Sequence, residues 1–306
     1  PYETDDRLHL GHGVSGPLTL IRASTGEGEA ELWEPFDDRL LARGRRRSIT
    51  KSLLGTWVEL EEVDERLGLG LRVRYTTSER YGFVRSVELR RLPGSPVTRV
   101  ALLDGLINLM PAGVPLGAQQ ATSCLVDAYK RAELDAETGL GIFSLEARIS
   151  DRAEPAESLR ANVVWSLGLR AARVLLSSAQ LNAFREGHAL HAEPLSTGRR
   201  GAYLLHATLD LAARPLARWQ IVGDVHLGQG EVEALRAELS DERALEARLV
   251  IDRAAEERRT HVGALRRVVA LELKVDELLF LRLELVFETV FLLFFLGLAA
   301  GKGEEK

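Results

Sequence analysis

Cysteine is almost absent from this chain of 306 residues, and so is methionine, with one of each. Because Cys124 has no second cysteine to pair with, no intramolecular disulfide can form, and packing alone must hold the fold together. A reducing, cytoplasmic setting fits this composition best. Aromatic residues make up only 6% of the chain, yet the apolar total of 45% is ample for a substantial core.

A strong excess of either charge is also missing. Lys and Arg together number 40 against 45 for Asp and Glu, which gives a formal net charge of -5. Such a balance provides no global field that would attract the phosphates of nucleic acids. Nucleic acid is therefore not an expected partner.

The chain lacks the long apolar runs of targeting and membrane segments. Its first residues are acidic, with no basic stretch leading into an apolar one, so no signal peptide is predicted, and the missing initiator Met suggests a fragment or a processed chain. The uncharged run Val290 to Leu298 is about half of the ~20 residues that a spanning helix needs. A membrane anchor is therefore the less favoured interpretation of the apolar C-terminus.

Strands are the clearest structural prediction from the residues that are present. From Leu18 to about Leu227 short apolar runs alternate with glycine- and proline-containing turns, and many runs have the period of two that buries one face of a strand. The alternating segments are Trp57–Glu61, Leu69–Tyr75, Phe83–Leu89, Ile142–Ile149 and Tyr203–Leu211. Many antiparallel strands with this spacing predict a mainly β fold of packed sheets.

Helices are predicted in three places. Gln119–Glu133 and Val174–Glu186 have the composition of short helices between strands, and Glu231–Val268 repeats apolar residues near the helical period without a proline. The alternation in Val269–Val275 favours strand as much as helix. These patterns divide the chain into a β domain at 1–228, a helical linker at 229–268 and an apolar C-terminal segment at 269–306.

Two motifs suggest phosphate binding, and each has a simpler interpretation. Gly11 to Gly16 has the spacing G-x-G-x-x-G, but Pro17 and a β-like segment follow where a dinucleotide site needs a helix. We expect a lead-in loop there. Arg43 to Arg47 is a basic cluster without interleaved aromatic residues, which favours a solvated turn over phosphate or sugar-phosphate binding.

No residue pattern for catalysis or for a metal is found. His188, His191 and Glu193 lack the spacing of a zinc site, so a polar loop is the favoured interpretation. The chain has no G-x-S-x-G elbow, and Cys124 lies in a predicted amphipathic helix. No paired carboxylates can be selected from so many acidic residues. We therefore assign no catalytic residue, metal or cofactor.

The four tryptophans are the residues best suited to stack on sugar rings. They are Trp33, Trp57, Trp165 and Trp219. Apolar neighbours favour core packing for most of them. Trp33 lies beside Glu34 and Pro35, so we predict that it is the most exposed of the four and a candidate for carbohydrate binding.

Five segments together resemble the large cellobiose phosphorylase-like proteins related to glycoside hydrolase family 94. The segments are Gly16–Arg39 (GPLTLIRASTGEGEAELWEPFDDR), Thr76–Arg85 (TTSERYGFVR), Asp104–Val114 (DGLINLMPAGV), Leu125–Leu134 (LVDAYKRAEL) and Asn162–Gly168 (NVVWSLG). No single one is diagnostic, and it is their order and joint presence, from about Leu8 to the region of Val250, that carries the resemblance.

The resemblance implies a galactose-mutarotase-like supersandwich, followed in such proteins by a helical linker and an α/α barrel that carries the catalytic carboxylate. Too few residues follow the helical segment to build that barrel, so no catalytic Asp can be transferred to this chain. If the β domain has a glycan site, we expect it in the loops Asp104–Gly113 and Asp127–Glu133. There Asp104, Asn108, Asp127 and Arg131 place polar groups beside apolar ones, although a role as structural polar anchors is the favoured interpretation.

The leading hypothesis is a non-catalytic supersandwich domain of a carbohydrate-active protein, which supports a barrel absent from this chain and binds carbohydrate or contacts a second copy. The first alternative is a mutarotase-like enzyme, which would need one of its histidines beside a carboxylate. The second is a structural or membrane-attached interaction module, motivated by the apolar C-terminus.

Overall fold

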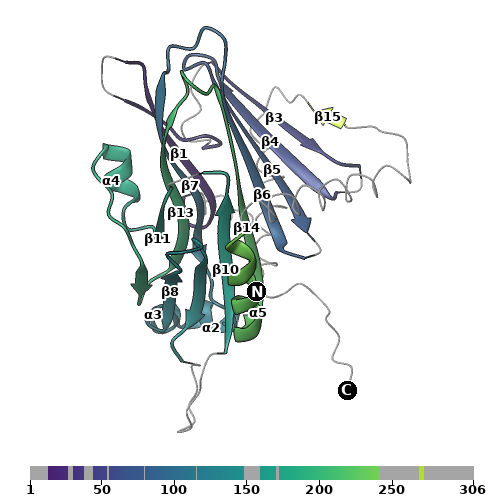
Figure 1. Ribbon diagram of the computed structural model, residues 1–306, viewed down its shortest axis with the longest axis vertical. Helices are drawn as coiled ribbons and strands as arrows, with labels where there is room; N and C mark the ends of the chain where they lie inside the picture. Colours follow the sequence, from purple (N-terminus) through teal and green to yellow (C-terminus); the bar gives the residue numbers. More distant parts are fainter. Residues whose placement is uncertain are drawn as a thin grey trace.

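The computed structural model describes residues 13–26, 30–37, 44–53, 55–78, 80–114, 116–147, 159–169, 172–241 and 269–271. Within these residues the chain forms two sheets of five and ten strands with a few short helices (Figure 1). All the strand pairings among the described residues are antiparallel, as in β1 with β7 and β5 with β6. The prediction of a mainly β sandwich is confirmed.

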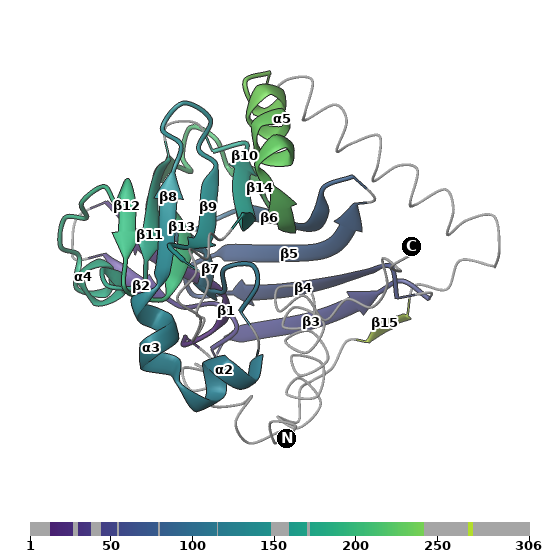
Figure 2. The ribbon, with the colours of Figure 1, turned by 90° about the horizontal axis from the view of Figure 1, so that it is seen from below.

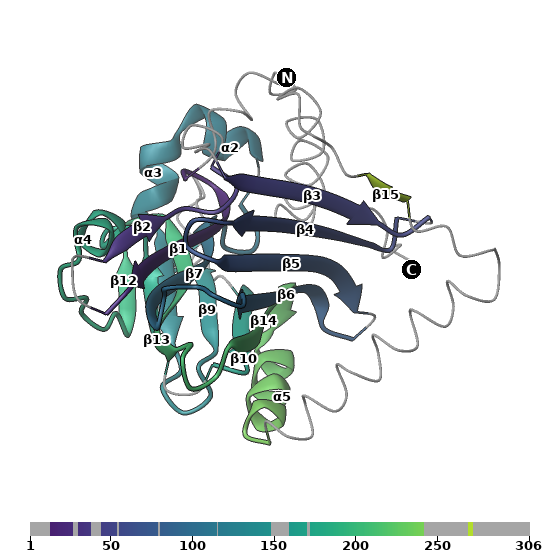
Figure 3. The same cartoon turned by 90° about the horizontal axis from the view of Figure 1, so that it is seen from above.

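The five-stranded sheet has the order β11 (Arg173–Ser177), β13 (Gly201–Asp210), β7 (Arg99–Leu109), β1 (Gly16–Ser24) and β2 (Glu31–Trp33). The ten-stranded sheet has the order β12 (Leu195–Thr197), β8 (Lys130–Leu134), β9 (Gly141–Leu145), β10 (Arg160–Leu167), β14 (Leu216–Gly228), β6 (Gly82–Arg91), β5 (Leu69–Ser78), β4 (Trp57–Asp64), β3 (Arg45–Lys51) and β15 (Val269–Leu271). In Figure 3, β3, β4, β5 and β6 run side by side and β14 continues the layer.

The main core lies between the two sheets and follows from the alternation in the sequence. Leu71 and Leu89 point inward from β5 and β6, and they belong to one buried cluster with Leu102 and Leu106 of β7. Since successive side chains of a strand point to opposite faces, the sequence neighbours of Leu71 in β5 and of Leu89 in β6 face outward.

Each sheet also has an outer face that is partly covered by a helix (Figure 2). On the five-stranded sheet, α4 (Leu181–Glu186) packs Phe184 into a buried cluster with Leu20. On the ten-stranded sheet, α5 (Gln229–Leu239) packs Leu235 against Trp165. The outer face of the ten-stranded sheet is therefore closed beside β10 and β14 by α5.

Four of the five predicted strands are confirmed as β4, β5, β6 and β13. In the fifth, Ile142–Ile149, strand β9 ends at Leu145, and the last two residues lie outside the described part of the chain. The two predicted short helices are only partly correct. Gln119–Glu133 contains the end of α2 (Leu116–Ala121) and all of α3 (Ser123–Ala128), but its last residues form strand β8. Val174–Glu186 begins within strand β11 and becomes helical only at α4. Neither strand shows an apolar period of two, because β8 buries Lys130 and Ala132 and β11 is buried at four successive positions.

The C-terminal predictions fall mostly outside the described residues. The helix predicted from Glu231 begins two residues earlier and is described as α5 to Leu239, whereas 242–268 are outside the description. Val269–Leu271 forms β15 and pairs with β3, as Val269 opposite Lys51 shows. Within the described part of the chain, no helix has both the length and the apolar character needed to cross a bilayer.

Candidate functional site

A buried ion pair links the two sheets, and it contains the first of the predicted site residues. Asp104 of β7 accepts hydrogen bonds from both terminal nitrogens of Arg85, at 2.6 and 2.8 Å. It also accepts one from Thr19 Oγ1 at 2.6 Å and one from Trp219 Nε1 at 2.6 Å. Burial lowers the pKa of Arg85, but the charges and hydrogen bonds of Asp104 and Tyr75 together outweigh it and the net pKa is raised. Asp104 lies in a strand and not in the predicted loop, and it anchors the interior.

Trp33 is fully buried, so the prediction that it is exposed is wrong. Its indole Nε1 donates to Glu62 Oε1 at 2.8 Å. The other oxygen of Glu62 accepts from Phe36 N at 2.8 Å and from Arg47 Nε at 2.6 Å. This carboxylate therefore fastens β2 and the turn after it to strands β3 and β4, and the ring of Trp33 has no surface to offer a sugar.

The basic cluster Arg43 to Arg47 was predicted to be a solvated turn, and this prediction is wrong for the part that forms strand β3. Arg45 and Arg47 lie in β3 with their side chains almost fully buried, and they form ion pairs with Asp64 and Glu62. Of the arginines of the cluster that the structure describes, only Arg46, on the opposite face of the strand, is exposed, with Glu65 as its partner. The alternation of a strand has divided the cluster between interior and solvent.

Asn108 lies at an irregularity of the sheet. The pairing of β7 with β13 shifts register between Gly201 and Ala202, which face Leu109 and Ile107, and leaves Asn108 unmatched. Its φ of 56° is in the left-handed region, which Asn tolerates better than most residues. Among the described residues, its buried Oδ1 has no hydrogen-bond partner.

Asp127 and Arg131 are held in local ion pairs beside β8. Asp127 contacts Lys130 Nζ at 2.8 Å and Arg200 Nε at 3.4 Å. Burial raises the pKa of Asp127, but these two cations outweigh it and hold that pKa below its usual value. Burial likewise lowers the pKa of Lys130, and its contact with Asp127 does not fully offset this. Arg131 contacts Glu133 in the same strand.

The structure does not bring the five predicted residues together. Among the described residues, no hydrogen bond or ion pair joins any two of Trp33, Asp104, Asn108, Asp127 and Arg131. Trp33 and Asp104 have their polar atoms engaged inside the protein, so we do not assign them to a ligand site.

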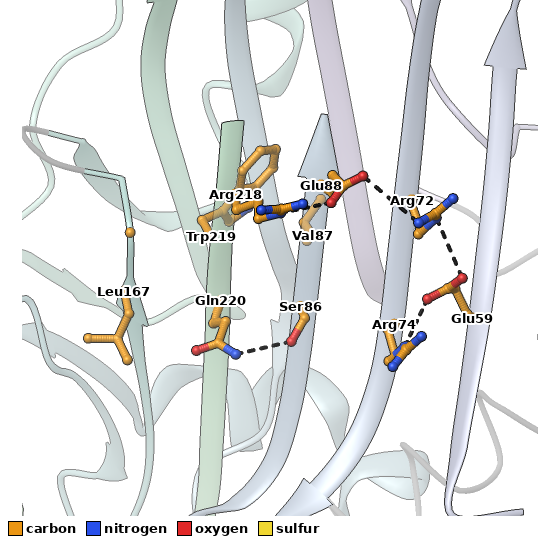
Figure 4. A pocket seen from close by; sticks show the side chains of 11 residues that line it. Glu59, Arg72, Arg74, Ser86, Val87, Glu88, Leu167, Arg218, Trp219 and Gln220 are labelled. Carbon is orange, nitrogen blue, oxygen red and sulfur yellow. Dashed lines mark hydrogen bonds and ion pairs between the residues drawn. The ribbon is translucent and has the colours of Figure 1, made fainter. Parts of the chain in front are cut away.

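A hollow on the outer face of the ten-stranded sheet is the better candidate for a site (Figure 4). It has a volume of about 310 Å³ and crosses β4, β5, β6, β14 and the end of β10. Its lining residues are Glu59, Arg72, Arg74, Ser86, Val87, Glu88, Leu167, Gly168, Arg218, Trp219 and Gln220. Because strands separated widely in the sequence supply them, the site depends on the complete sheet.

Strand register arranges the polar residues of the hollow in two rows. In one row Gln220 lies opposite Ser86, Ser86 opposite Arg74, and Arg74 opposite Glu59. Gln220 Nε2 donates to Ser86 Oγ at 3.2 Å, and Arg74 Nε donates to Glu59 Oε2 at 2.8 Å. This row therefore presents an amide, a hydroxyl, a guanidinium and a carboxylate side by side.

The second row is more strongly charged. Arg218 lies opposite Glu88, and Glu88 opposite Arg72. Arg218 Nε donates to Glu88 Oε2 at 2.8 Å, while the other oxygen of Glu88 is 3.9 Å from Arg72 Nη1. Arg72 also reaches Glu59 of the first row, with Nε and Oε1 separated by 3.5 Å. The side chains thus hold one another across the sheet, as Figure 4 shows.

Two tryptophans lie at this part of the sheet, in different ways. The guanidinium of Arg74 covers the ring of Trp57, with 4.6 Å between its central carbon and the ring centroid. Trp219 borders the hollow, but its side chain is buried and its indole donates inward to Asp104. Trp57 is thus the aromatic ring whose surroundings a ligand in the hollow would alter.

The hollow offers no group that resembles a catalytic histidine. Histidine is absent from its lining, whereas a mutarotase-like reaction would need one beside an acid. Among the described histidines, His188 has Glu186 as an ion-pair partner, but both side chains are exposed beyond the end of α4. No three His, Cys, Asp or Glu side chains in the described ranges could together hold a metal ion.

The hollow was not predicted from the sequence, although the lining residues from β4, β5 and β6 lie in predicted strands. The segments Leu69–Tyr75 and Phe83–Leu89 alternate, and their polar positions include Arg72, Arg74, Ser86 and Glu88. The available signal was that alternate residues on one face of both strands are charged or polar. The missing information was which strands are neighbours.

Comparison with known proteins gives a structural likeness and no sequence family. No family model matches the chain, and no curated protein matches it significantly. A solved structure that is similar is a bacterial glucoamylase complexed with acarbose, with 10% sequence identity and a TM-score of 0.45. The similarity covers 78% of this chain and 30% of that chain, so this chain corresponds to a minor part of that protein's length.

Proposed function

We propose that this chain is a non-catalytic β domain of a carbohydrate-active protein and that the hollow on its ten-stranded sheet binds carbohydrate. One observation carries the proposal. Guanidinium, carboxylate, amide and hydroxyl groups from four neighbouring strands line a single hollow and are held in place by one another.

Such a surface suits a ligand that has many hydroxyl groups. Each hydroxyl both donates and accepts, so a sugar needs closely spaced acceptors and donors. Glu59 and Glu88 supply acceptors, and the arginines beside them supply planar sets of donors. Since these side chains are already ordered by their ion pairs, binding would cost less side-chain entropy than ordering free ones.

The sequence resemblance to cellobiose phosphorylase-like proteins supports the same class of function. In that arrangement the sandwich would support a catalytic barrel, and carbohydrate, that barrel or a second copy would be its partners. The proposed division is a β domain at 1–228, a linker at 229–268 and a C-terminal segment at 269–306. An unpaired cysteine that is exposed on α3 fits the proposed cytoplasmic setting.

Calorimetry tests the binding part of the proposal. We would titrate the purified chain with a panel of gluco-oligosaccharides and expect saturable binding. The variant Gln220→Ala should bind at least several-fold more weakly, because it removes an amide from the hollow. Asn182→Ala removes an exposed amide from α4, on the other sheet, and should bind as the unaltered chain does. Equal loss in both variants, or no binding by a folded sample, would contradict the proposal.

The non-catalytic part needs a separate measurement. The chain should release no sugar from the same oligosaccharides, either in water or with inorganic phosphate. Hydrolysis or phosphorolysis that persists through purification and is lost in a variant of the hollow, such as Glu59→Gln, would contradict the non-catalytic claim. It would not contradict carbohydrate binding in the hollow.

A further inference from the structure

The charges in the hollow do not cancel. Its lining includes three arginines, Arg72, Arg74 and Arg218, against two glutamates, Glu59 and Glu88. Glu61, at its border, accepts hydrogen bonds from Arg90 Nη2 at 2.6 Å and from Arg72 Nη2 at 3.2 Å, and counting Glu61 and Arg90 together leaves an excess of one positive charge. The chain as a whole has a formal net charge of -5, so a positive hollow is a local departure from its general character.

The excess positive charge has hydrogen-bond donors available. Arg218 uses Nε to reach Glu88 Oε2, and its side chain is 68% exposed. Among the described residues, its terminal Nη1 and Nη2 have no protein partner. Arg72 Nη2 donates to Glu61 Oε1 at 3.2 Å, and Arg72 Nε is buried beside Glu59, which leaves Nη1 as the remaining donor of Arg72. Arg72 Nη1 lies 3.9 Å from Glu88 Oε1, and Arg218 Nε donates to Glu88 Oε2, so both guanidiniums lie beside Glu88 (Figure 4).

The hollow is less well equipped for a neutral sugar that binds by stacking. Trp57 has one ring face occupied by the guanidinium of Arg74, and Trp219 turns its indole into the interior. Recognition must then come mainly from the charged groups. A guanidinium with two free parallel N–H groups matches the oxygens of a phosphate or carboxylate.

We propose that the hollow binds an anionic sugar, one whose phosphoryl or carboxylate group is held by Arg218 and Arg72. This inference rests on the proposed function, because it specifies the class of carbohydrate. The sugar hydroxyls contact Ser86, Gln220 and Glu59, which lie in the neighbouring row. Phosphate and carboxylate share the relevant geometry, so the experiment compares them directly.

The test is calorimetric titration of the full chain with four probes, namely glucose, glucuronate, glucose 6-phosphate and inorganic phosphate. We expect at least one anionic sugar to bind about tenfold or more tightly than glucose and than inorganic phosphate. Its affinity should weaken with added salt, because charge attraction is screened. Tighter binding of glucuronate or of glucose 6-phosphate identifies the anion.

Two substitutions with opposite expected effects on affinity distinguish a binding site from a general structural effect. Arg218→Gln should weaken binding of the anionic sugar about tenfold or more, a larger factor than its effect on glucose. Glu88→Gln removes the competing carboxylate and should strengthen anion binding. Arg46→Gln, which alters an exposed arginine paired with Glu65 away from the hollow, is the control and should change nothing.

The alternative results are distinct. If glucose and the anionic sugars bind equally and Arg218→Gln has no effect, the anion site is refuted while the proposed function stands. If inorganic phosphate binds as tightly as glucose 6-phosphate, the hollow is an anion site without sugar recognition and both proposals fail as stated. Absence of binding by all four probes overturns the anion site, whereas the titration with gluco-oligosaccharides still decides the proposed function.

Discussion

Single residues decide how the two sheets are joined. Arg85 and Asp104 form an ion pair between the sheets with side chains that are 2% and 0% exposed. Desolvating two charges is expensive, and only good geometry and further hydrogen bonds recover that cost. Thr19 and Trp219 supply these further bonds to Asp104. The pair therefore fixes the relative position of the sheets more than it adds to their stability.

Removing one member of this pair should lower the free energy of unfolding much more than removing both. Asp104→Leu leaves Arg85 buried without its partner, and we expect the free energy of unfolding to fall by about 3–5 kcal/mol. The double variant Arg85→Met, Asp104→Leu should recover a large part of that loss. Urea unfolding measures both. A single variant that loses less than about 1 kcal/mol would mean that the pair is not buried as the structure has it.

The buried side chain of Lys130 should make the stability of the fold depend on pH. Because burial lowers its pKa in the folded state, the unfolded chain binds more protons between the folded and the ordinary pKa. Stability of the unaltered chain should therefore rise with pH through that alkaline window. Lys130→Met removes the titrating group, so the difference in unfolding free energy between the two chains should change across that window. A constant difference between them from neutral to alkaline pH would contradict this.

At the scale of elements, α5 belongs to the β domain and is more than a connection. Leu235 is buried against the outer face of the ten-stranded sheet, in a cluster with Trp165 and Val222. At the start of the helix, Glu231 accepts a hydrogen bond from Gly228 N at 2.7 Å. Both features show that the helix is tied to the strand before it.

Truncating that contact should therefore weaken the whole domain. Leu235→Ala is expected to lower the free energy of unfolding by about 2–3 kcal/mol. Glu233→Ala, two positions earlier and exposed, should stay within about 0.5 kcal/mol of the unaltered chain. If both variants unfold at the same urea concentration, α5 does not contribute to the core.

The elements also show what the sequence could predict. Strands β5 and β6 were predictable because inward-facing apolar residues alternate with outward-facing polar ones along most of each strand. Strand β8 buries Lys130 and Ala132 in place of large apolar residues, and β11 is buried at four successive positions, so an apolar period of two is missing from both. Tertiary pairing, not local preference, makes them strands.

At the scale of the whole molecule, the candidate site comes from strands that are neighbours only in space. Ser86 and Gln220 are separated by 134 positions and meet because β6 pairs with β14. Sequence alone gave the polarity of each strand but not this adjacency. The same missing information explains the wrong prediction for Trp33. Its acidic neighbours in the sequence suggested exposure to solvent, but Glu62, 29 positions away, accepts its indole hydrogen bond inside the protein.

The central claim is that carbohydrate binds in the hollow of the ten-stranded sheet. The most direct test is an NMR titration that follows the four tryptophan indole N–H signals as sugar is added. Trp57 lies against Arg74 of the hollow, whereas Trp33 and Trp165 are fully buried elsewhere. We predict a saturable shift of the Trp57 signal, with those of Trp33 and Trp165 unchanged. A sugar that binds without moving the Trp57 signal, or that moves the buried ones instead, would contradict the claim.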